Sequence, residues 1–280
     1  MNVILDGVWS EIDRVVKPGS IVCINIGDAT RTLNKSFSIY PSSVRILKFF
    51  YDRDYYTLPE ILWRKQVNAP NKYMGSGMLP VGAYVTLEHE YILILRKGLK
   101  RREFKSEEEK NNRRESAFFW EERNTWFSDV WFDVKGTKQN LLNDNLRDRS
   151  AAYPFELPYR LINMFSVKGD TILDPYLGTG TTTLAAAVSG RNSVGIEVVK
   201  EFKNTIEHRL SDVVNFSNKV VDDRLQAHEV FVEARKSTGK DFKYINKTYN
   251  FPVVSKQEVE IKFDSISKID FMENNSYSIG

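Results

Sequence analysis

Apolar and polar residues alternate along the first hundred residues in a way that predicts one helix and three strands. Apolar positions recur with helical spacing from Leu5 to Val16, and Lys17-Pro18-Gly19 ends the pattern. The mainly apolar run from Ile21 to Ile26 predicts a fully buried strand. Residues 56–65 and 91–95 are further strand candidates. This order of elements is typical of an α/β sheet.

A second strand-and-helix pattern follows beyond the middle of the chain. Thr171–Asp174 predicts a short strand, residues 184–187 a slim helix and residues 192–196 the next strand. The C-terminal part is moderately polar, and we expect only scattered strands there, at 249–254 and 259–263. A helix between two short apolar strands predicts a parallel pair of the kind found in α/β sheets.

Composition places the chain among globular proteins. Its 280 residues, 41% of them apolar, suffice for one or two domains with a buried core. The formal net charge of +3 arises from 40 basic and 37 acidic residues, so a polyanionic partner must be held by a local patch. Cys23 is the single cysteine and has no partner for an intrachain disulfide, and no apolar run reaches the ~18 residues of a membrane span. We expect a soluble, cytoplasmic protein that binds no membrane.

Two acidic residues close the paired strands around a glycine-rich turn. Asp174 ends the first strand, and Gly178 and Gly180 allow the chain to turn tightly with its N–H groups open. Glu197 follows the second strand, 23 residues after Asp174. This is close to the offset of roughly 20 residues at which an acidic side chain meets ribose hydroxyls in nucleotide-binding folds. The sequence therefore predicts a ligand that carries a ribose.

Three ligands of that kind compete. Thr181-Thr182 follows Gly180 where a triphosphate-binding loop needs a lysine, so ATP is disfavoured; either threonine can instead cap the helix. Thr183 stands where a dinucleotide fingerprint has its third glycine, which disfavours NAD. S-adenosylmethionine carries a ribose and an amino-acid tail without phosphate, and it suits the two carboxylates. A plain strand-turn-helix without a ligand is the remaining alternative.

These residues carry a family resemblance. The segment Asp174-Pro175-Tyr176-Leu177-Gly178-Thr179-Gly180-Thr181-Thr182, followed by Gly195-Ile196-Glu197, resembles the cofactor motif of DNA methyltransferases that modify exocyclic amino groups, the N4-cytosine and N6-adenine enzymes. The resemblance implies that Asp174 orients the methionine tail through the loop and that Glu197 accepts hydrogen bonds from the ribose. It also implies S-adenosylmethionine as cofactor.

The likeness extends over about residues 5–210. Residues 153–157 resemble the family's Phe-Pro-x-x-Leu segment along the cofactor, and Asp129-Val130-Trp131 precedes it at the usual place; residues 14–19 and 89–92 resemble inner strands. The cofactor-binding residues implied are Asp174, Pro175, Tyr176, Gly178, Thr179, Gly180, Thr181, Thr182, Glu197, Tyr153, Pro154, Phe155, Leu157 and Trp131. The implied fold class is α/β, a Rossmann-like methyltransferase sheet with helices on both faces.

The order of segments resembles the family's permuted subgroup, with target recognition in mid-chain. We expect an inner part of the core at 1–98, a recognition insertion at 99–150, the cofactor-binding part at 151–215 and a C-terminal extension at 216–280. Between Arg96 and Asn124 there are ten Arg or Lys against seven Glu. The expected DNA contacts are Lys97, Lys100, Arg101, Arg102, Lys105, Arg113 and Arg114. A solvated, charge-mixed surface remains the alternative.

The family's catalytic motif is absent from these 280 residues. It reads Ser, Asp or Asn, then Pro-Pro, then Tyr or Phe; its polar groups accept hydrogen bonds from the target amine while the ring stacks on the flipped base. The nearest strings are Ile39-Tyr40-Pro41-Ser42, Asn68-Ala69-Pro70-Asn71, Leu157-Pro158-Tyr159 and Phe251-Pro252-Val253, and none has paired prolines after a polar residue. We predict no catalytic residue in the chain and a sheet without its central catalytic strand.

These features predict methyl transfer from S-adenosylmethionine to an exocyclic amino group in double-stranded DNA, of restriction-modification type, with N4 of cytosine slightly favoured. We expect the sequence to be the C-terminal part of a longer enzyme, with little activity alone. The alternatives are a non-catalytic relative or a subunit that binds cofactor and DNA and is completed by a separate N-terminal chain. The expected partners are double-stranded DNA and either such a chain or a second copy in a homodimer. An RNA or small-molecule methyltransferase is disfavoured by the basic insertion. The histidines, His89, His208 and His228, lack ligand partners at useful spacing, so no metal site is predicted.

Overall fold

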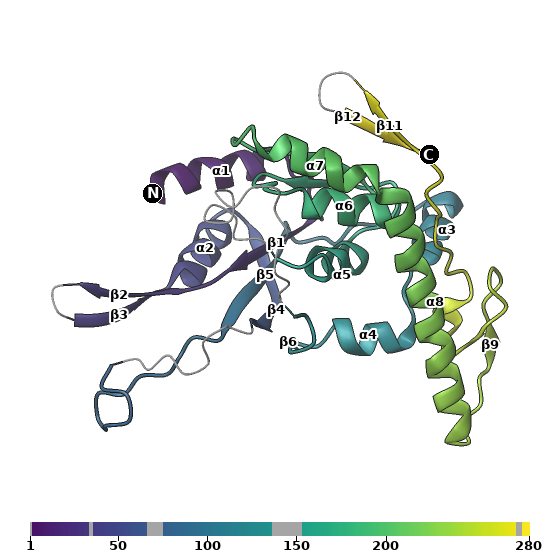
Figure 1. The fold of residues 1–280 in the computed structure, drawn as a ribbon, viewed down its shortest axis with the longest axis horizontal. Helices are drawn as coiled ribbons and strands as arrows, with labels where there is room; N and C mark the ends of the chain where they lie inside the picture. Colours follow the sequence, from purple (N-terminus) through teal and green to yellow (C-terminus); the bar gives the residue numbers. More distant parts are fainter. Residues whose placement is uncertain (1, 34–35, 66–74, 136–152, 273–275) are drawn as a thin grey trace. The chain divides into compact units, whose positions relative to one another are not determined.

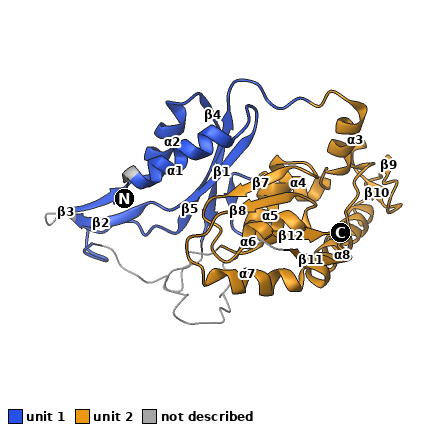
Figure 2. Ribbon diagram, turned by 90° about the horizontal axis from the view of Figure 1, so that it is seen from above, with its two compact units in different colours: residues 1–103, 128–136 blue, residues 104–127, 137–280 orange. Residues whose placement is uncertain are grey.

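The computed structural model describes residues 2–33, 36–65, 75–135, 153–272 and 276–280. The chain divides into two compact units (Figure 2): unit 1 is Met1–Glu103 with Ser128–Gly136, and unit 2 is Phe104–Phe127 with Thr137–Gly280. Part of the predicted insertion, from residue 136 to 150, lies outside the described residues. The remainder of the insertion contributes to both units.

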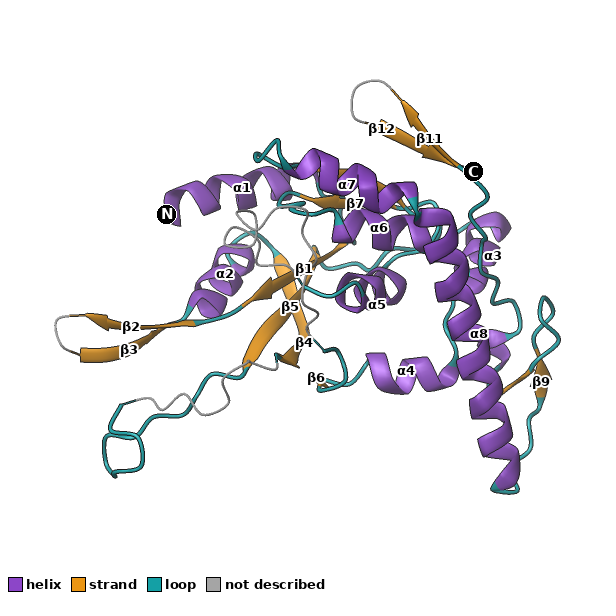
Figure 3. Ribbon diagram, viewed as in Figure 1, coloured by secondary structure: helices purple, strands orange, loops and turns teal. Residues whose placement is uncertain are grey.

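Unit 1 contains α1 (Asn2–Val15), β1 (Ile21–Ile26), β2 (Ala29–Leu33), β3 (Ser36–Tyr40), α2 (Ser42–Tyr51), β4 (Tyr55–Arg64), β5 (His89–Lys97) and β6 (Val130–Trp131). Unit 2 contains α3 (Glu107–Glu115), α4 (Trp120–Trp126), α5 (Glu156–Phe165), β7 (Thr171–Asp174), α6 (Thr181–Val188), β8 (Asn192–Gly195), α7 (Phe202–Ser211), α8 (Val213–Ser237), β9 (Tyr244–Ile245), β10 (Pro252–Val253), the 3-10 helix η2 (Lys256–Glu258), β11 (Ile269–Met272) and β12 (Ser276–Ile279). Figures 1 and 3 show these elements.

Unit 1 is built on a four-stranded sheet in the order β1-β5-β4-β6. Strand β5 runs antiparallel to β1 and β4, whereas β4 and β6 are parallel. The four residues Ile92–Leu95 of β5 are at most 4% exposed, so both faces of this strand are covered. The strands predicted at 21–26, 56–65 and 91–95 are therefore confirmed.

Two helices cover the apolar side chains of this sheet. Trp9 of α1 and Phe50 of α2 have ring centroids 5.9 Å apart, and Phe50 meets Tyr55 of β4 edge-on at 4.9 Å. Ile12 and Leu93 complete the same buried cluster. Burial of each such side chain contributes about 1.5–3 kcal/mol, which is why the helical spacing of apolar residues predicted α1 correctly.

Strand β1 differs from the prediction in its burial. The apolar run Ile21–Ile26 predicted a strand covered on both faces, but only Ile24 is buried and its neighbours are half-buried. The physical reason is position: in the described part of the chain β1 pairs with β5 alone and is an edge strand of this sheet.

Unit 2 contains a parallel pair, β7 and β8, connected by α6. Asp174 of β7 lies opposite Gly195 of β8, so the two strands end together and bring the two acidic residues to one edge. Ala185 and Ala186 of α6 are fully buried, and their small side chains let the helix pack closely in the core. The predicted strand-helix-strand pattern is confirmed.

The C-terminal part departs from the prediction. Its main element is the 25-residue helix α8, where we expected scattered strands. The strand expected at 249–254 shrinks to Pro252–Val253, and residues 259–263 form no strand. The sequence does not show an apolar stripe for α8, because two of the buried positions of this helix are polar, Ser217 and His228.

Candidate functional site

Asp174 ends β7 and holds the following loop through both carboxylate oxygens. Its Oδ1 accepts a hydrogen bond of 2.9 Å from the N–H of Tyr176, and its Oδ2 accepts one of 3.3 Å from the hydroxyl of Tyr153. The Tyr153 hydroxyl also lies 2.6 Å from Oγ1 of Thr182 in α6. Burial and the charge of Asp174 raise the pKa of Tyr153, so the phenol stays protonated and can donate to the carboxylate.

Glu197 closes the loop from the side of the second strand. Its Oε2 accepts a hydrogen bond of 2.7 Å from the N–H of Gly178, and its Oε1 accepts one of 2.7 Å from the N–H of Val199. Each carboxylate oxygen has two lone pairs, so both oxygens retain capacity for a second donor. The side chain is half-buried, and a ligand hydroxyl can reach a carboxylate that the protein has already oriented.

The glycines between the acidic residues have a conformational reason. Gly178 has φ +54° and Gly180 has φ +80°, in the left-handed region that residues other than glycine disfavour. A Cβ on Gly180 would lie 3.0 Å from Cγ1 of Ile206. Gly180 is itself the N-cap of α6, so the expectation that Thr181 or Thr182 caps the helix is wrong; both are buried within its first turn.

The threonines of the loop and of α6 differ in their hydrogen bonding. Thr181 accepts a hydrogen bond of 3.0 Å from Arg209, and Thr182 bonds with Tyr153. Thr179 is only 3% exposed, and its Oγ1 has no hydrogen-bond partner. A buried hydroxyl without a partner is costly, and a polar group of a ligand would satisfy it.

Exposed apolar side chains flank the two carboxylates. Tyr176 is 51% exposed, Ile196 58% and Val198 90%. The cofactor-binding residues expected from the sequence include Tyr176 but neither Val198 nor Ile196, although Ile196 belongs to the motif; these two stand on either side of Glu197. Apolar residues at a strand end next to an acidic residue were the signal that could have identified them. A flat apolar ring would bury part of this surface.

The segment predicted to run along the cofactor lies in unit 2 at the start of α5. Leu157 is 2% exposed and Pro154 is buried, and Phe155 stacks on Tyr159 with ring centroids 5.0 Å apart. These three residues pack in the core, and Tyr153 alone of the segment has a polar group beside Asp174. Their packing fixes the position of the Tyr153 hydroxyl.

Trp131 belongs to unit 1, in β6, opposite Trp63 of β4. Both indoles are at most 1% exposed, and Nε1 of Trp63 donates a hydrogen bond of 2.8 Å to the carbonyl of Val134. In this structure Trp131 is a core residue of unit 1, and its predicted proximity to the cofactor stays a prediction.

The cations predicted to contact DNA are divided between the units. They are Lys97, Lys100, Arg101 and Arg102 in unit 1, and Lys105, Arg113 and Arg114 in unit 2. Lys97 forms an ion pair of 3.0 Å with Asp13 of α1. The guanidinium of Arg113 lies 4.9 Å over the ring of Phe104. Contact with DNA stays a prediction for all seven.

Helix α3 carries the acidic residues that interrupt this basic region. Ser106 and Glu109 form a capping box, in which each side chain bonds the other residue's backbone N–H. Glu107 and Glu108 stand in the same first turn, where negative charge stabilises a helix. None of the residues of α3 is buried, and most of them are exposed.

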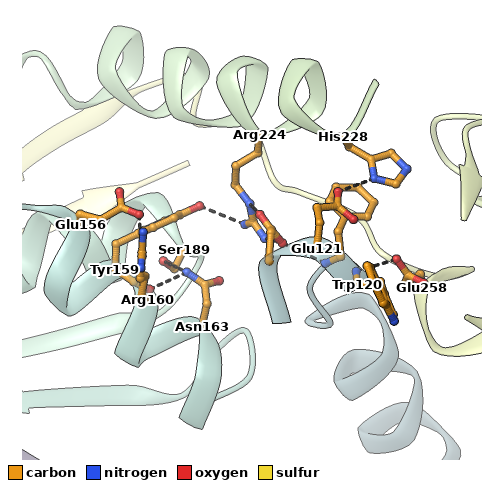
Figure 4. A network of polar contacts seen from close by, with 12 residues as sticks. Trp120, Glu121, Glu156, Tyr159, Arg160, Asn163, Ser189, Arg224, His228 and Glu258 are labelled. Atoms are coloured by element: carbon orange, nitrogen blue, oxygen red, sulfur yellow. Dashed lines mark hydrogen bonds and ion pairs between the residues drawn. The ribbon is translucent and has the colours of Figure 1, made fainter. Parts of the chain in front are cut away.

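Unit 2 buries a network of charged side chains that the sequence did not reveal (Figure 4). Arg224 of α8 donates hydrogen bonds of 2.6 and 2.7 Å to the carboxylate of Glu122 in α4, and one of 3.0 Å to the hydroxyl of Tyr159 in α5. Glu258 accepts a hydrogen bond of 2.8 Å from the N–H of Trp120. The C-terminal elements thereby hold α4 in place through buried charges.

His228 lies in the same region and is fully buried. Its Nδ1 is 2.6 Å from Oε1 of Glu121, and its Nε2 is 3.0 Å from the carbonyl oxygen of Pro252. The ring stacks on Phe119 at 3.9 Å. Both neighbours of the ring nitrogens accept hydrogen bonds, which suits an imidazolium that donates twice. Burial alone would lower the pKa of His228, but the hydrogen bond and charge of Glu121 together with the Pro252 carbonyl raise it.

This arrangement predicts a pH dependence of stability. Because the folded pKa of His228 is above its ordinary value of 6.5, its contribution is fully present below pH 6.5 and is lost as the pH rises through the folded pKa. We expect the free energy of unfolding to fall in that window by up to about 1.4 kcal/mol per pH unit, and His228→Gln to remove the slope. Urea denaturation at a series of pH values measures it. His208→Gln, at an exposed histidine, should keep the wild-type slope; a flat wild-type profile would contradict the protonated state.

Neither a metal-binding cluster nor a membrane-spanning helix is found among the described residues. No group of three or more His, Cys, Asp and Glu residues in that part of the chain is arranged to hold a metal ion. Within the same residues, no helix is both apolar enough and long enough to cross a bilayer.

Comparison with known proteins gives the chain its family. A family model described as DNA methylase matches residues 3–208. The type II methyltransferase M.MthZI of Methanothermobacter thermautotrophicus is 53% identical over 273 residues, which are 98% of this chain and 75% of that protein. M.MjaI of Methanocaldococcus jannaschii, also a type II methyltransferase, is 49% identical over 210 residues, covering 75% of this chain and 67% of that protein.

A solved structure has the same fold. The putative DNA modification methylase TTHA0409 of Thermus thermophilus, crystallised with S-adenosyl-L-methionine, matches with a TM-score of 0.61 and 31% identity, covering 75% of this chain and 76% of that one. The predicted α/β methyltransferase fold and the resemblance drawn from the loop at Asp174 are thus confirmed. With the match to residues 3–208 and the identity to M.MthZI, the chain belongs to the N6/N4 DNA methylase family.

Proposed function

We propose that the chain binds S-adenosylmethionine and serves methyl transfer to an exocyclic amino group of a base in duplex DNA, with N4 of cytosine favoured over N6 of adenine. The observation that carries the proposal is the Glu197 carboxylate, held by the N–H groups of Gly178 and Val199 with lone pairs to spare. Family membership supports the reaction type. The preference for cytosine comes from general resemblance.

The loop residues fit the proposed cofactor. Glu197 would accept hydrogen bonds from the ribose hydroxyls, and the adenine would cover the exposed Ile196 and Val198. Asp174 would hold the loop against the amino-acid tail, and Thr179 would gain a partner for its buried hydroxyl. The bound cofactor supplies an electrophilic methyl group on a sulfonium. The chain's own residues then orient it and keep the loop closed around it.

The target amine needs groups that the 280 residues do not contain. Its lone pair is delocalised into the base, and the absent Pro-Pro motif would accept hydrogen bonds from it. We propose that a segment carrying this motif, on a longer chain or a separate one, is needed for turnover. Two strands support this: among the described residues β1 pairs only with β5, and β7 only with β8, so each has an edge that can accept another strand.

The test separates binding from chemistry. The 280-residue protein should give heat with S-adenosylmethionine in calorimetry but transfer little labelled methyl to duplex DNA. A chimera that adds the part of M.MthZI without a counterpart here should gain at least about a hundredfold in turnover, since general base and electrostatic groups contribute on that scale. Mass spectrometry of the nucleosides then identifies the base. Robust turnover by the chain alone would refute the need for the segment, and absence of heat would refute cofactor binding.

A further inference from the structure

The end of helix α8 leads into a short run rich in basic residues. We name residues 235–247 the basic tip: they contain Arg235, Lys236, Lys240, Lys243 and Lys247 against a single acidic residue, Asp241. The tip comprises the last turn of α8, the segment that follows it, β9 and the next two residues, in the yellow-green part of Figure 1. It lies beyond residues 3–208, which the DNA methylase model matches, so family membership assigns it no role.

Three of these charges are available to a partner. Lys236, Lys240 and Lys243 are exposed, and in the described part of the chain no carboxylate pairs with them. Lys247 is different, because it pairs with Glu260 at 2.5 Å. Exposed ammonium groups without partners attract phosphate strongly at low salt.

The helix macrodipole explains only part of this charge. Basic residues in the last turn of a helix interact favourably with its negative end, which accounts for Arg235 and Lys236. Helix α8 ends at Ser237 with Thr238 as its C-cap, so Lys240 and Lys243 lie past the reach of that effect. Their position calls for another explanation.

The backbone that follows these lysines, at residues 244–246, is held by pairing and by buried hydrogen bonds. Tyr244 and Ile245 of β9 pair with Val253 and Pro252 of β10. The buried Asn246 donates hydrogen bonds of 2.9 Å to each of two backbone carbonyls, those of Glu258 and Ile261. One end of the tip is anchored in this way, which limits the conformational entropy that is lost when a rigid polymer binds.

Arg235 joins the tip to α4. Its guanidinium lies 5.6 Å from the ring centres of both Trp120 and Phe242, and its Nε is buried without an acceptor. Tyr244 and Ile245, 36% and 58% exposed, add apolar surface beside the lysines. Cations mixed with apolar groups suit a sugar-phosphate backbone, whose charges are spaced along a less polar sugar chain.

We infer that the basic tip is a contact surface for the phosphate backbone of duplex DNA. The choice of DNA as the partner rests on the proposed function. The charge of the tip and the exposure of its lysines are observed independently of that function. Such a contact positions the protein on the duplex without reading sequence, because phosphates are the same at every base pair. The C-terminal extension would then contribute to DNA affinity together with the mid-chain insertion.

The test compares two triple variants by fluorescence anisotropy on a labelled duplex, without cofactor, over about 50 to 200 mM salt. The tip variant is Lys236→Gln, Lys240→Gln, Lys243→Gln. The control, Lys203→Gln, Lys219→Gln, Lys268→Gln, removes the same charge from exposed lysines that are already paired with Glu207, Asp223 and Asp270. Each phosphate contact contributes about 0.9 to the slope of log Kobs against log salt, so the tip variant should lose about 2 to 3 units and the control less than about 1.

The outcomes are decisive in each direction. Equal slopes for the tip variant and the wild type, equal losses in both variants, or a wild type that binds no duplex would each overturn the inference. So would a wild type that binds poly-glutamate through these lysines more tightly than it binds the duplex, because the partner would then be an acidic protein. Heat with S-adenosylmethionine should be unchanged in the tip variant, so failure of this surface is distinguishable from failure of the cofactor site.

Discussion

Glu197→Gln is expected to lower the affinity for S-adenosylmethionine by about 10- to 100-fold. The carboxylate accepts from two backbone N–H groups, those of Gly178 and Val199, and an amide can accept from only one of them. The amide nitrogen would face the second N–H, donor against donor. The displaced amide then no longer accepts from the ribose hydroxyls as the carboxylate is proposed to do. Losing one charge-assisted hydrogen bond to the ligand costs about 1.5–3 kcal/mol, and every 1.4 kcal/mol is about tenfold in affinity.

Calorimetry with S-adenosylmethionine and its demethylated product measures this effect. Glu201→Gln is the matched control, since Glu201 is exposed and stands four residues further along the same loop and helix start. The control should bind and unfold as the wild type does. Glu197→Gln should unfold at a lower temperature, because it loses a hydrogen bond to the backbone, and should still be folded during the titration. Wild-type affinity in Glu197→Gln would mean that the ribose is not held by this carboxylate.

The loop between Asp174 and α6 could be predicted because its information is local. Asp174 ends a four-residue apolar strand, Gly178 and Gly180 need positive φ, and Glu197 follows the next strand, so adjacent residues specify the turn. The hydrogen-bond partners of the residues around this loop could not be predicted from the sequence. The bond between the hydroxyls of Tyr153 and Thr182 joins residues 29 positions apart, and its geometry depends on how α5 and α6 pack.

The C-terminal region shows why the remainder was missed. A surface helix is predicted from an apolar stripe, but α8 turns His228 and Arg224 inward, and these residues look like surface positions in a sequence. Their charges are tolerated inside only because Glu121 and Glu122, about a hundred residues earlier, lie opposite them. Neither the α4 segment nor the α8 segment alone predicts the pairing, because in each sequence the charged residues look exposed to solvent.

The buried ion pair in this region leads to the largest stability effect that we expect. Glu122→Gln should destabilise unit 2 by about 3–5 kcal/mol, because it leaves the guanidinium of Arg224 in the core without a counter-charge. The two side chains are 13% and 10% exposed, so water cannot replace the lost partner. Burial acts to lower the pKa of Arg224, while Glu122 and Tyr159 raise it. The variant removes the Glu122 charge, but an arginine guanidinium does not lose its proton inside a protein, so Arg224 stays charged and the penalty remains.

Arg224→Met should cost less than Glu122→Gln. The Glu122 carboxylate left behind still accepts a hydrogen bond of 2.9 Å from the N–H of Phe119 at the start of α4, where the helix dipole favours negative charge. The double variant should be at least about 1 kcal/mol more stable than the sum of the single losses predicts.

Asp223→Asn is the control. It breaks the exposed pair with Lys219 on the same helix and should cost under about 1 kcal/mol. Urea denaturation of the four variants measures these differences, and a loss below about 1 kcal/mol in Glu122→Gln would show that the pair does not hold α4 to α8.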